Sequence, residues 1–278
     1  VLEYRSGAPY ESVAGFGVVG RWVRGVHRYA ADVAVVAAGV HALRMGLEGR
    51  SWGPRARAWV SGVVLLGGLL VCGWTGYVLV WDVQAQVLVE EGARWLDLWP
   101  LFGEPLGRLF AGDAPVPGAF FFLNLFVHLA LPVGLCLVLW VHVSRVARPQ
   151  LWPPRALAVG LGVGLAVLAA VWAAPLGPPA DPLRVPGRVP LDGFYLFWLP
   201  WLKRLPAAVV WVVLLAVVGV VCLVPVWARP RGGRRAPVRR RRSRRWRAHP
   251  ARAACESQRR PHRRSRTPRP RSRAGGAS

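Results

Sequence analysis

The sequence has few of the residues from which soluble proteins build disulfide frameworks and zinc sites. It contains only four cysteines, and they form no CxxC, CxxCH or zinc-like spacing. Three of them fall in apolar runs, where a cysteine usually serves as a small buried side chain. We therefore expect no disulfide framework among Cys72, Cys136, Cys222 and Cys255.

The first residues also lack the pattern of a secretory signal peptide. The chain opens with the polar stretch VLEYRSGAPYES, whereas a signal peptide has a charged start and then a short apolar run. We therefore expect no cleaved leader within these residues.

Acidic residues are scarce as well, and the charge is unevenly distributed. Of the 37 Lys and Arg residues, 20 lie in residues 229–278, which contain a single acid, Glu256. This segment has almost no hydrophobic content, so we expect a disordered basic tail. Its arginines could bind anionic lipid headgroups or nucleic acid. Because Lys203 is the only lysine of the chain, the arginine bias also fits a GC-rich gene read out of frame.

Long apolar runs dominate the rest of the chain, and 54% of all residues are hydrophobic. Each run reaches the ~20 residues that a helix needs to cross a bilayer, where a helix satisfies its own backbone. The sequence therefore predicts an all-α, multi-pass membrane bundle of about five spans. The runs cover residues 17–45, 58–81, 118–144, 156–175 and 206–227.

The connections between these runs alternate in charge. Loops 46–57 and 145–155 are basic, whereas loop 82–117 has six acids against Arg94 and Arg108. Because basic loops stay in the cytoplasm, we expect the Arg-rich tail there and loop 82–117 outside. A connection this long within a compact domain is usually functional.

Four of the six histidines lie within predicted membrane helices, and they are regularly spaced. His27 and His41 are fourteen residues apart, and so are His128 and His142. Fourteen residues return to nearly the same helix face about 21 Å along the axis. One hairpin separates the two helices, so they run in parallel, and His27 can face His128 while His41 faces His142. Since histidine is a common axial haem ligand, the spacing predicts two b-type haems with bis-histidine iron.

Glycines and arginines near these helices fit the same scheme. Gly62 and Gly76 are also fourteen apart, and a haem edge can approach a backbone closely where no Cβ intervenes. Helix–helix packing is the alternative role of such glycines. Arg24 and Arg44 lie near His27 and His41, where they could pair with haem propionates or simply reach the membrane surface as snorkelling cations.

Several motifs resemble cytochrome b of the cytochrome bc complexes. WVRGVHRY followed by HALR resembles the second helix of that family, and GWTGYVLVWD resembles the end of the third. HLALP resembles the start of the fourth helix, APYESV the stretch before the second, and VPLDGFYLFWLPWL the loop between the fifth and sixth. The resemblance covers about residues 10–227 and suggests a shortened or split form, because the family's first, seventh and eighth helices have no counterpart.

This resemblance implies roles for individual residues. His27 and His128 would hold a low-potential haem near the outer face, and His41 and His142 a high-potential haem near the cytoplasmic face. PLDGFY would stand where the family has its Pro-Glu-Trp-Tyr motif. Asp192 and Tyr195 would then be the catalytic residues of an outer quinol-oxidation site. Val80, which replaces the family's proline before Trp81, is a departure at the same site.

The resemblance also implies an organisation and a function. Residues 1–16 would be a polar lead-in, 17–150 a di-haem core, 151–228 two further membrane helices with a quinol-site loop, and 229–278 the tail. The chain would move electrons between quinol and quinone in the bacterial inner membrane, as a possibly dimeric subunit of a quinol–cytochrome c type oxidoreductase. Its partners would be a Rieske iron–sulfur protein and a c-type cytochrome or equivalent acceptor.

Two other functions are compatible with the sequence. One is a di-haem membrane anchor that links a dehydrogenase or hydrogenase to quinone. The other is a non-functional truncated fragment, or a basic binding protein tethered to the membrane. The matched spacing of histidines and glycines argues against the anchor, and bound haem would argue against the fragment.

Overall fold

The structure is a computed structural model that describes residues 3–100, 103–111, 115–144, 152–187, 189, 190 and 192–227. The chain divides into two units, Val1–Arg229 and Pro230–Ser278. The description ends at residue 227, so the predicted disordered tail, residues 229–278, lies outside the described residues. Within the described part of the first unit, the regular elements are helices, accompanied by one isolated bridge between Asp82 and Pro179.

The apolar runs of the sequence form the long helices of the structure. Four helices are long and apolar enough to cross a membrane, with α3 extended by the short turn η1 (Gly53–Arg55). The fifth, α6, is apolar but has only 17 residues, about 25 Å, which is at the lower limit for a span. The all-α membrane bundle is thus confirmed, with bounds α2 Val18–Leu47, α3 Ala56–Val78, α5 Gly118–Ser144, α6 Arg155–Val171 and α8 Ala207–Trp227.

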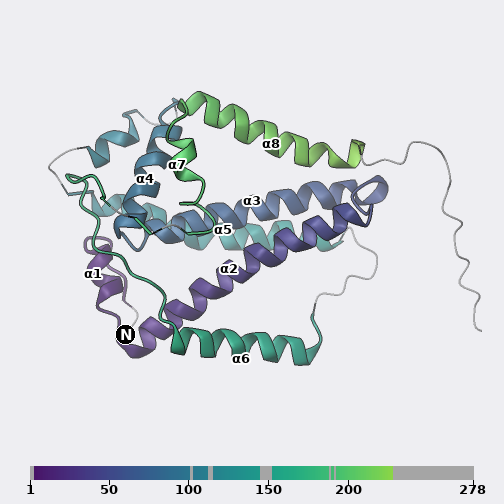
Figure 1. Cartoon of the computed structure of the whole chain (residues 1–278), viewed down its shortest axis with the longest axis horizontal. Coiled ribbons are helices and arrows are strands. Elements are labelled where there is room, and N and C mark those ends of the chain that lie inside the picture. The colour runs from purple at the N-terminus through teal and green to yellow at the C-terminus, as the bar shows by residue number, and fades with distance from the viewer. Residues whose placement is uncertain are drawn as a thin grey trace, which may run out of the picture. The chain divides into compact units, whose positions relative to one another are not determined.

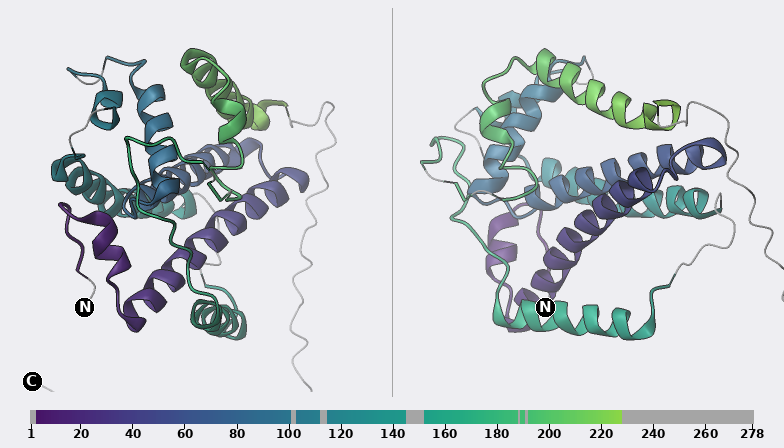
Figure 2. Two further views of the ribbon diagram at one scale, coloured as in Figure 1. Left: turned by 60° about the vertical axis from the view of Figure 1, so that its left-hand side comes forward. Right: turned by 45° about the vertical axis from the view of Figure 1, so that its right-hand side comes forward.

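Successive long helices run in opposite directions, so the connections gather at the two ends of the bundle (Figure 1). The segments after α3 and after α6 lie at the same end as α1 (Pro9–Ala14), and both views of Figure 2 agree. Because α2 and α5 run in parallel, the first histidine of each helix lies towards this end. We call it the loop end.

Helix α3 lies at the centre of the bundle. It packs along α5, and it also contacts α2 and α8. Helix α2 packs on α6, where a Cβ at Gly25 would lie 3.1 Å from that of Ala169. By contrast, α2 and α5 are not in extended contact. The Trp59 indole donates to the Val221 carbonyl at 2.7 Å and so ties α3 to α8.

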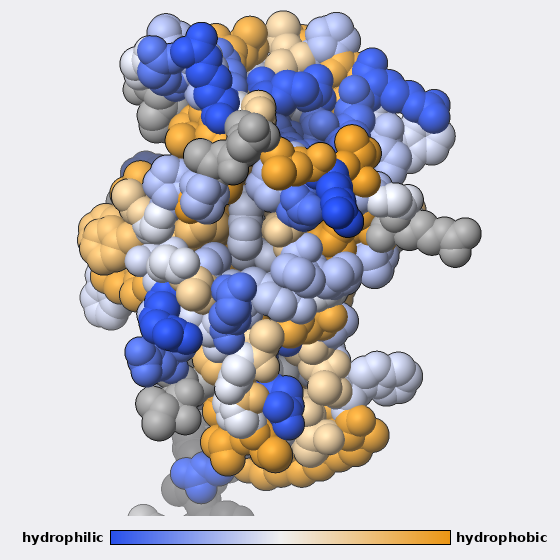
Figure 3. Space-filling model, turned by 90° about the vertical axis from the view of Figure 1, so that its left-hand side faces the viewer, coloured by the Kyte–Doolittle hydropathy of each residue, from blue (hydrophilic) through white to orange (hydrophobic). Residues whose placement is uncertain are grey.

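The described part of the long acidic connection is largely folded, whereas the sequence was interpreted as a loop. It contains η2 (Leu106–Phe110) and α4 (Val83–Leu96), most of whose residues are buried. Gln86 fixes α4 to the later connection, because its Nε2 donates to the carbonyls of Asp181 and Arg184 at 2.9 and 3.1 Å. Figure 3 looks on to this end, where hydrophilic and apolar side chains alternate over the surface.

Asp82 joins three parts of the loop end. Its Oδ1 caps α4 by accepting from the backbone N–H groups of Gln84 and Ala85 at 3.0 and 3.1 Å. Its Oδ2 accepts from the N–H of Gly177 at 3.0 Å, and the side chain is buried. One carboxylate therefore starts a helix and holds the segment that follows α6.

We expect Asp82→Ala to lower stability by about 1–2 kcal/mol, since losing an N-cap costs up to about 2 kcal/mol. Thermal unfolding of the purified chain in detergent would show this as a lower midpoint. Asp82→Asn is the matched control, because asparagine is also a good N-cap and should lose less. An Asp82→Ala midpoint equal to that of the wild type would contradict this role.

Candidate functional site

The structure brings together the two histidines nearest the loop end. The rings of His27 on α2 and His128 on α5 have centroids 6.1 Å apart and planes 85° apart. Metal–imidazole bonds are about 2 Å long, so two rings on opposite sides of one metal ion have centroids about 6 Å apart. The pair therefore has the separation that axial ligands of a haem iron require.

A cavity of about 500 Å³ opens beside this pair. This volume is within the range of small-molecule and cofactor sites. Its walls come from α2, α3, α5 and both connections of the loop end, which explains why α2 and α5 hardly touch. Of the residues expected at the site, the lining includes His27, His128, Gly76, Arg24 and Asp192.

The glycines of α3 make room for the histidine rings of α5. A Cβ at Gly76 would lie 3.0 Å from Cε1 of His128, and a Cβ at Gly62 would lie 3.3 Å from Cε1 of His142. Real Cβ atoms are rarely so close to another side chain, so larger residues would push the rings away from α3. The neighbours of these glycines are thus imidazoles, where the sequence analysis placed a haem edge.

The rings of α5 are also hydrogen-bonded to α3, a feature that the sequence analysis missed. Nδ1 of His128 lies 2.9 Å from Oγ1 of Thr75 and 3.0 Å from the carbonyl oxygen of Cys72. Nδ1 of His142 lies 3.0 Å from Oγ of Ser61. With Nδ1 occupied, Nε2 of each ring is the nitrogen available to a metal, which is the usual arrangement of ligating histidines. The residues present therefore fit a haem.

The second predicted pair is more exposed at His41 than at His142. His41 is exposed on α2, and His142 is half-buried between α3 and α5. The parallel run of α2 and α5 places both towards the end opposite the loop end. Arg44 is exposed and pairs with Glu48 at 2.8 Å, and this ion pair lowers the pKa of the Glu48 carboxyl. Arg44 thus has a partner on its own chain, and its expected contact with a propionate stays a prediction.

Arg24 lines the cavity but is also bonded to the segment after α6. Its Nη1 donates to the Ala174 carbonyl at 2.9 Å, and its Nη2 donates to that of Pro175 at 2.7 Å. Tyr29 donates similarly to the Trp172 carbonyl at 3.1 Å. These bonds hold an extended backbone against α2, so α6 ends at Val171 instead of continuing to residue 175 as predicted.

Asp192 and Tyr195 lie in the connection before α8, and they face different surroundings. Oδ1 of Asp192 accepts from the N–H groups of Phe194 and Tyr195, both at 2.7 Å, while its Oδ2 is buried without a hydrogen-bond partner. The Tyr195 hydroxyl donates to the Leu70 carbonyl at 2.6 Å. Burial raises the pKa of Tyr195, so this phenol stays protonated. Asp192 therefore has the free oxygen, whereas Tyr195 anchors the segment to α3.

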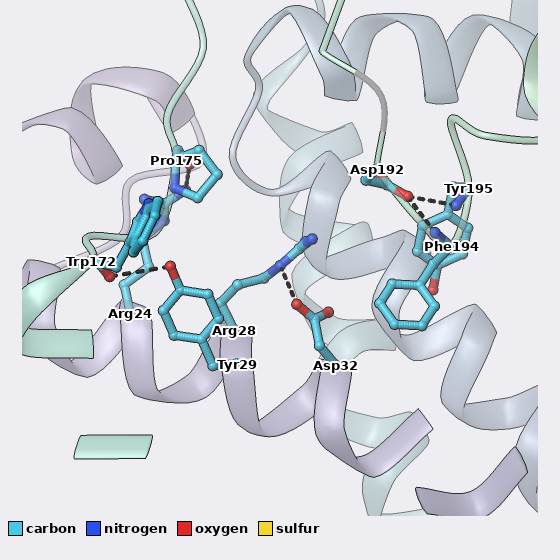
Figure 4. A network of polar contacts seen from close by, with 9 residues as sticks. All are labelled: Arg24, Arg28, Tyr29, Asp32, Trp172, Pro175, Asp192, Phe194 and Tyr195. Carbon is cyan, nitrogen blue, oxygen red and sulfur yellow. Dashed lines mark hydrogen bonds and ion pairs between the residues drawn. The ribbon is translucent and has the colours of Figure 1, made fainter. Parts of the chain in front are cut away.

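Two charged residues of α2 complete the polar wall of the cavity (Figure 4). Arg28 pairs with Asp32 at 3.2 Å, and its guanidinium lies 4.2 Å from the ring centroid of Tyr77 on α3. In Figure 4 the guanidinium points from α2 towards the segment that carries Asp192. Arg28 and Asp32 were not predicted as site residues, although charged residues within a membrane span are a functional signal. Tyr77 on α3 lines the same part of the cavity.

Val80 also lines the cavity, and its backbone explains why proline is not required there. Its N–H donates to the Tyr77 carbonyl at 3.0 Å, a bond that a proline could not make. The next residue, Trp81, has a φ of 53°, and its ring packs on Phe121 with centroids 4.9 Å apart. The end of α3 is therefore fixed by this bond and by aromatic packing.

Comparisons with known proteins agree with this geometry. Residues 15–149 match the family model described as Cytochrome b/b6/petB. The cytochrome b subunit of menaquinol:cytochrome c reductase from Geobacillus thermodenitrificans is 31% identical over 140 residues, and that from Bacillus subtilis is 30% identical. Each alignment covers 49% of this chain and 61% of the relative. The region that forms α2 to α5 is therefore similar to the cytochrome b family, and the chain spans about 61% of the length of the curated relatives it matches.

Proposed function

We propose that the chain is a di-haem cytochrome b subunit of a bc-type quinol oxidoreductase, in which His27 with His128 and His41 with His142 hold the irons. The 6.1 Å separation of the His27 and His128 rings is the observation that carries the proposal. Bound haem would supply one-electron transfer along the bundle. The protein would hold it through the histidines, the glycines of α3 and the apolar part of the cavity wall.

The second part of the proposal concerns a quinol site at the loop end. Asp192 would accept a proton from a quinol hydroxyl at Oδ2, because this oxygen is buried, unpartnered and part of the cavity wall. Oδ1 is already used by two backbone N–H groups, which orient the carboxylate. The Arg28–Asp32 pair would keep the opposite wall polar. A quinol of the menaquinol type is proposed because both relatives are named for it.

Partners and orientation follow from the same proposal. A Rieske iron–sulfur protein and a c-type cytochrome would accept electrons, as the name of the relatives, menaquinol:cytochrome c reductase, suggests. The loop end, with its acidic residues, would face outwards, and the Arg-rich tail would face the cytoplasm of a bacterial cell. The basic loop after α2 supports this orientation.

Counting haems tests the proposal directly. Reduced-minus-oxidised spectra of the purified full chain, calibrated by extracting the haem, should give two b-type haems per polypeptide. The four histidines on two parallel helices provide for that number. One haem or none would overturn the di-haem function, and a quinone-linked anchor would retain haem but reduce no cytochrome c when combined with a Rieske partner.

A further inference from the structure

A small polar motif occurs twice on the face of α3 that meets α5. Ser61 Oγ donates to the Ala58 carbonyl at 3.1 Å, and Thr75 Oγ1 donates to the Cys72 carbonyl at 2.8 Å. Each hydroxyl also lies within 3.0 Å of Nδ1 of one histidine of α5. The two copies are fourteen residues apart, as Gly62 and Gly76 are. Each hydroxyl-bearing residue immediately precedes one of these two glycines.

The positions of the protons follow from these contacts. A hydroxyl has one hydrogen, and here it is used at the carbonyl three residues earlier, so towards the ring the oxygen can only accept. With the hydroxyl hydrogen assigned to that carbonyl, the hydrogen between each hydroxyl and its ring lies on Nδ1. The Cys72 carbonyl lies 3.0 Å from Nδ1 of His128. Because a carbonyl oxygen only accepts, this contact also places the hydrogen on Nδ1 of His128. Nε2 is then left with its lone pair.

Back-bonding of serine or threonine to a carbonyl is common inside helices and by itself indicates no site. Here, however, both hydroxyls face an imidazole, and both sit beside the glycine on which that imidazole rests. A fixed Nδ1–H bond orients a ligating ring and raises its basicity towards the metal. The repeat thus gives the two rings of α5 the same support at two levels of the bundle.

We propose that Ser61 and Thr75 are positioning residues that set the tautomer and orientation of His142 and His128 and thereby lower the reduction potentials of the two haems. This inference rests on the proposed ligation of haem by these histidines. A more basic imidazole favours the oxidised iron, so loss of either hydroxyl raises the potential of the haem at its own level. The other haem keeps its value, because the two motifs are about 21 Å apart along α3.

Redox titration of the purified full chain, followed through the haem absorption bands, tests this inference. Thr75→Val keeps the shape of the side chain but removes the hydroxyl, and it should shift the midpoint of the haem held by His128 upwards. Ser61→Ala should do the same for the haem held by His142. Electron paramagnetic resonance of each oxidised variant should show a changed signal at the same haem only, because the signal depends on ring orientation.

The hydroxyl-bearing variants Thr75→Ser and Ser61→Thr are the matched controls and should titrate as the wild type does. If a variant loses its haem, recovery of that haem in its hydroxyl-bearing counterpart supports the inference, and failure to recover it contradicts it. Unchanged potentials and signals in both variants, with two haems bound, would refute the role of the hydroxyls and leave the histidine ligation intact. A wild-type chain without haem would instead refute the proposed function.

Discussion

His128→Leu is expected to remove one of the two haems and leave the other in place. His128 holds its ring between α3 and the cavity, with Nδ1 bonded to Thr75 and Cε1 next to Gly76. Leucine fills similar space but offers no ligand, so the iron would lose one of its two axial bonds. The haem content of the purified variant, measured from its reduced-minus-oxidised spectrum, should fall by about half.

His142→Leu should remove the other haem, and the two variants should lose different components of the redox titration. His249→Ala, in the basic segment outside the described residues, is the matched histidine control and should keep both haems. Should either leucine variant retain two haems with unaltered absorption, the assignment of the ligands would be wrong.

Asp192→Asn is expected to slow quinol oxidation by roughly 100-fold or more, the usual effect of removing a general base. The amide can still accept from the N–H groups of Phe194 and Tyr195 through its oxygen, so the segment should keep its shape. What it loses is the carboxylate oxygen that faces the cavity. Steady-state reduction of cytochrome c by quinol, in the complex assembled with its partners, would measure the loss.

Asp181→Asn provides the control for this variant, because Asp181 caps Leu183 and pairs with Arg184 on the same connection but does not line the cavity. Its rate should stay near that of the wild type, and both variants should retain two haems. A rate for Asp192→Asn within two- or threefold of the wild type would show that the proton leaves by another route.

The sequence was sufficient to predict the long helices because their composition alone determines them. The predicted runs 118–144 and 206–227 coincide with α5 and α8 to within one residue. Helix α4 was missed because a helix buried within protein lacks the long apolar run of a membrane span. Its signal was the N-cap Asp82, which requires knowledge of the backbone to recognise.

The candidate site was predictable to a similar degree. The regular spacing of the histidines predicted that His27 and His128 lie close together, because the spacing of residues along a helix determines their positions on it. Ser61 and Thr75 could not be recognised in this way, because their role depends on which face of α3 meets α5. The ion pair of Arg44 with Glu48 was not predicted, and the expected contact of Arg44 with a propionate stays a prediction.

The bonds that join the two connections at the loop end bear on how such a protein can evolve. Asp82 reaches Gly177, and Gln86 reaches Asp181 and Arg184, across almost a hundred residues of chain. Together with the packing of α6 on α2, they are contacts between the earlier and the later helices other than the peptide link between α5 and α6. A gene interrupted between those helices would therefore encode two polypeptides whose surfaces already specify how they reassemble.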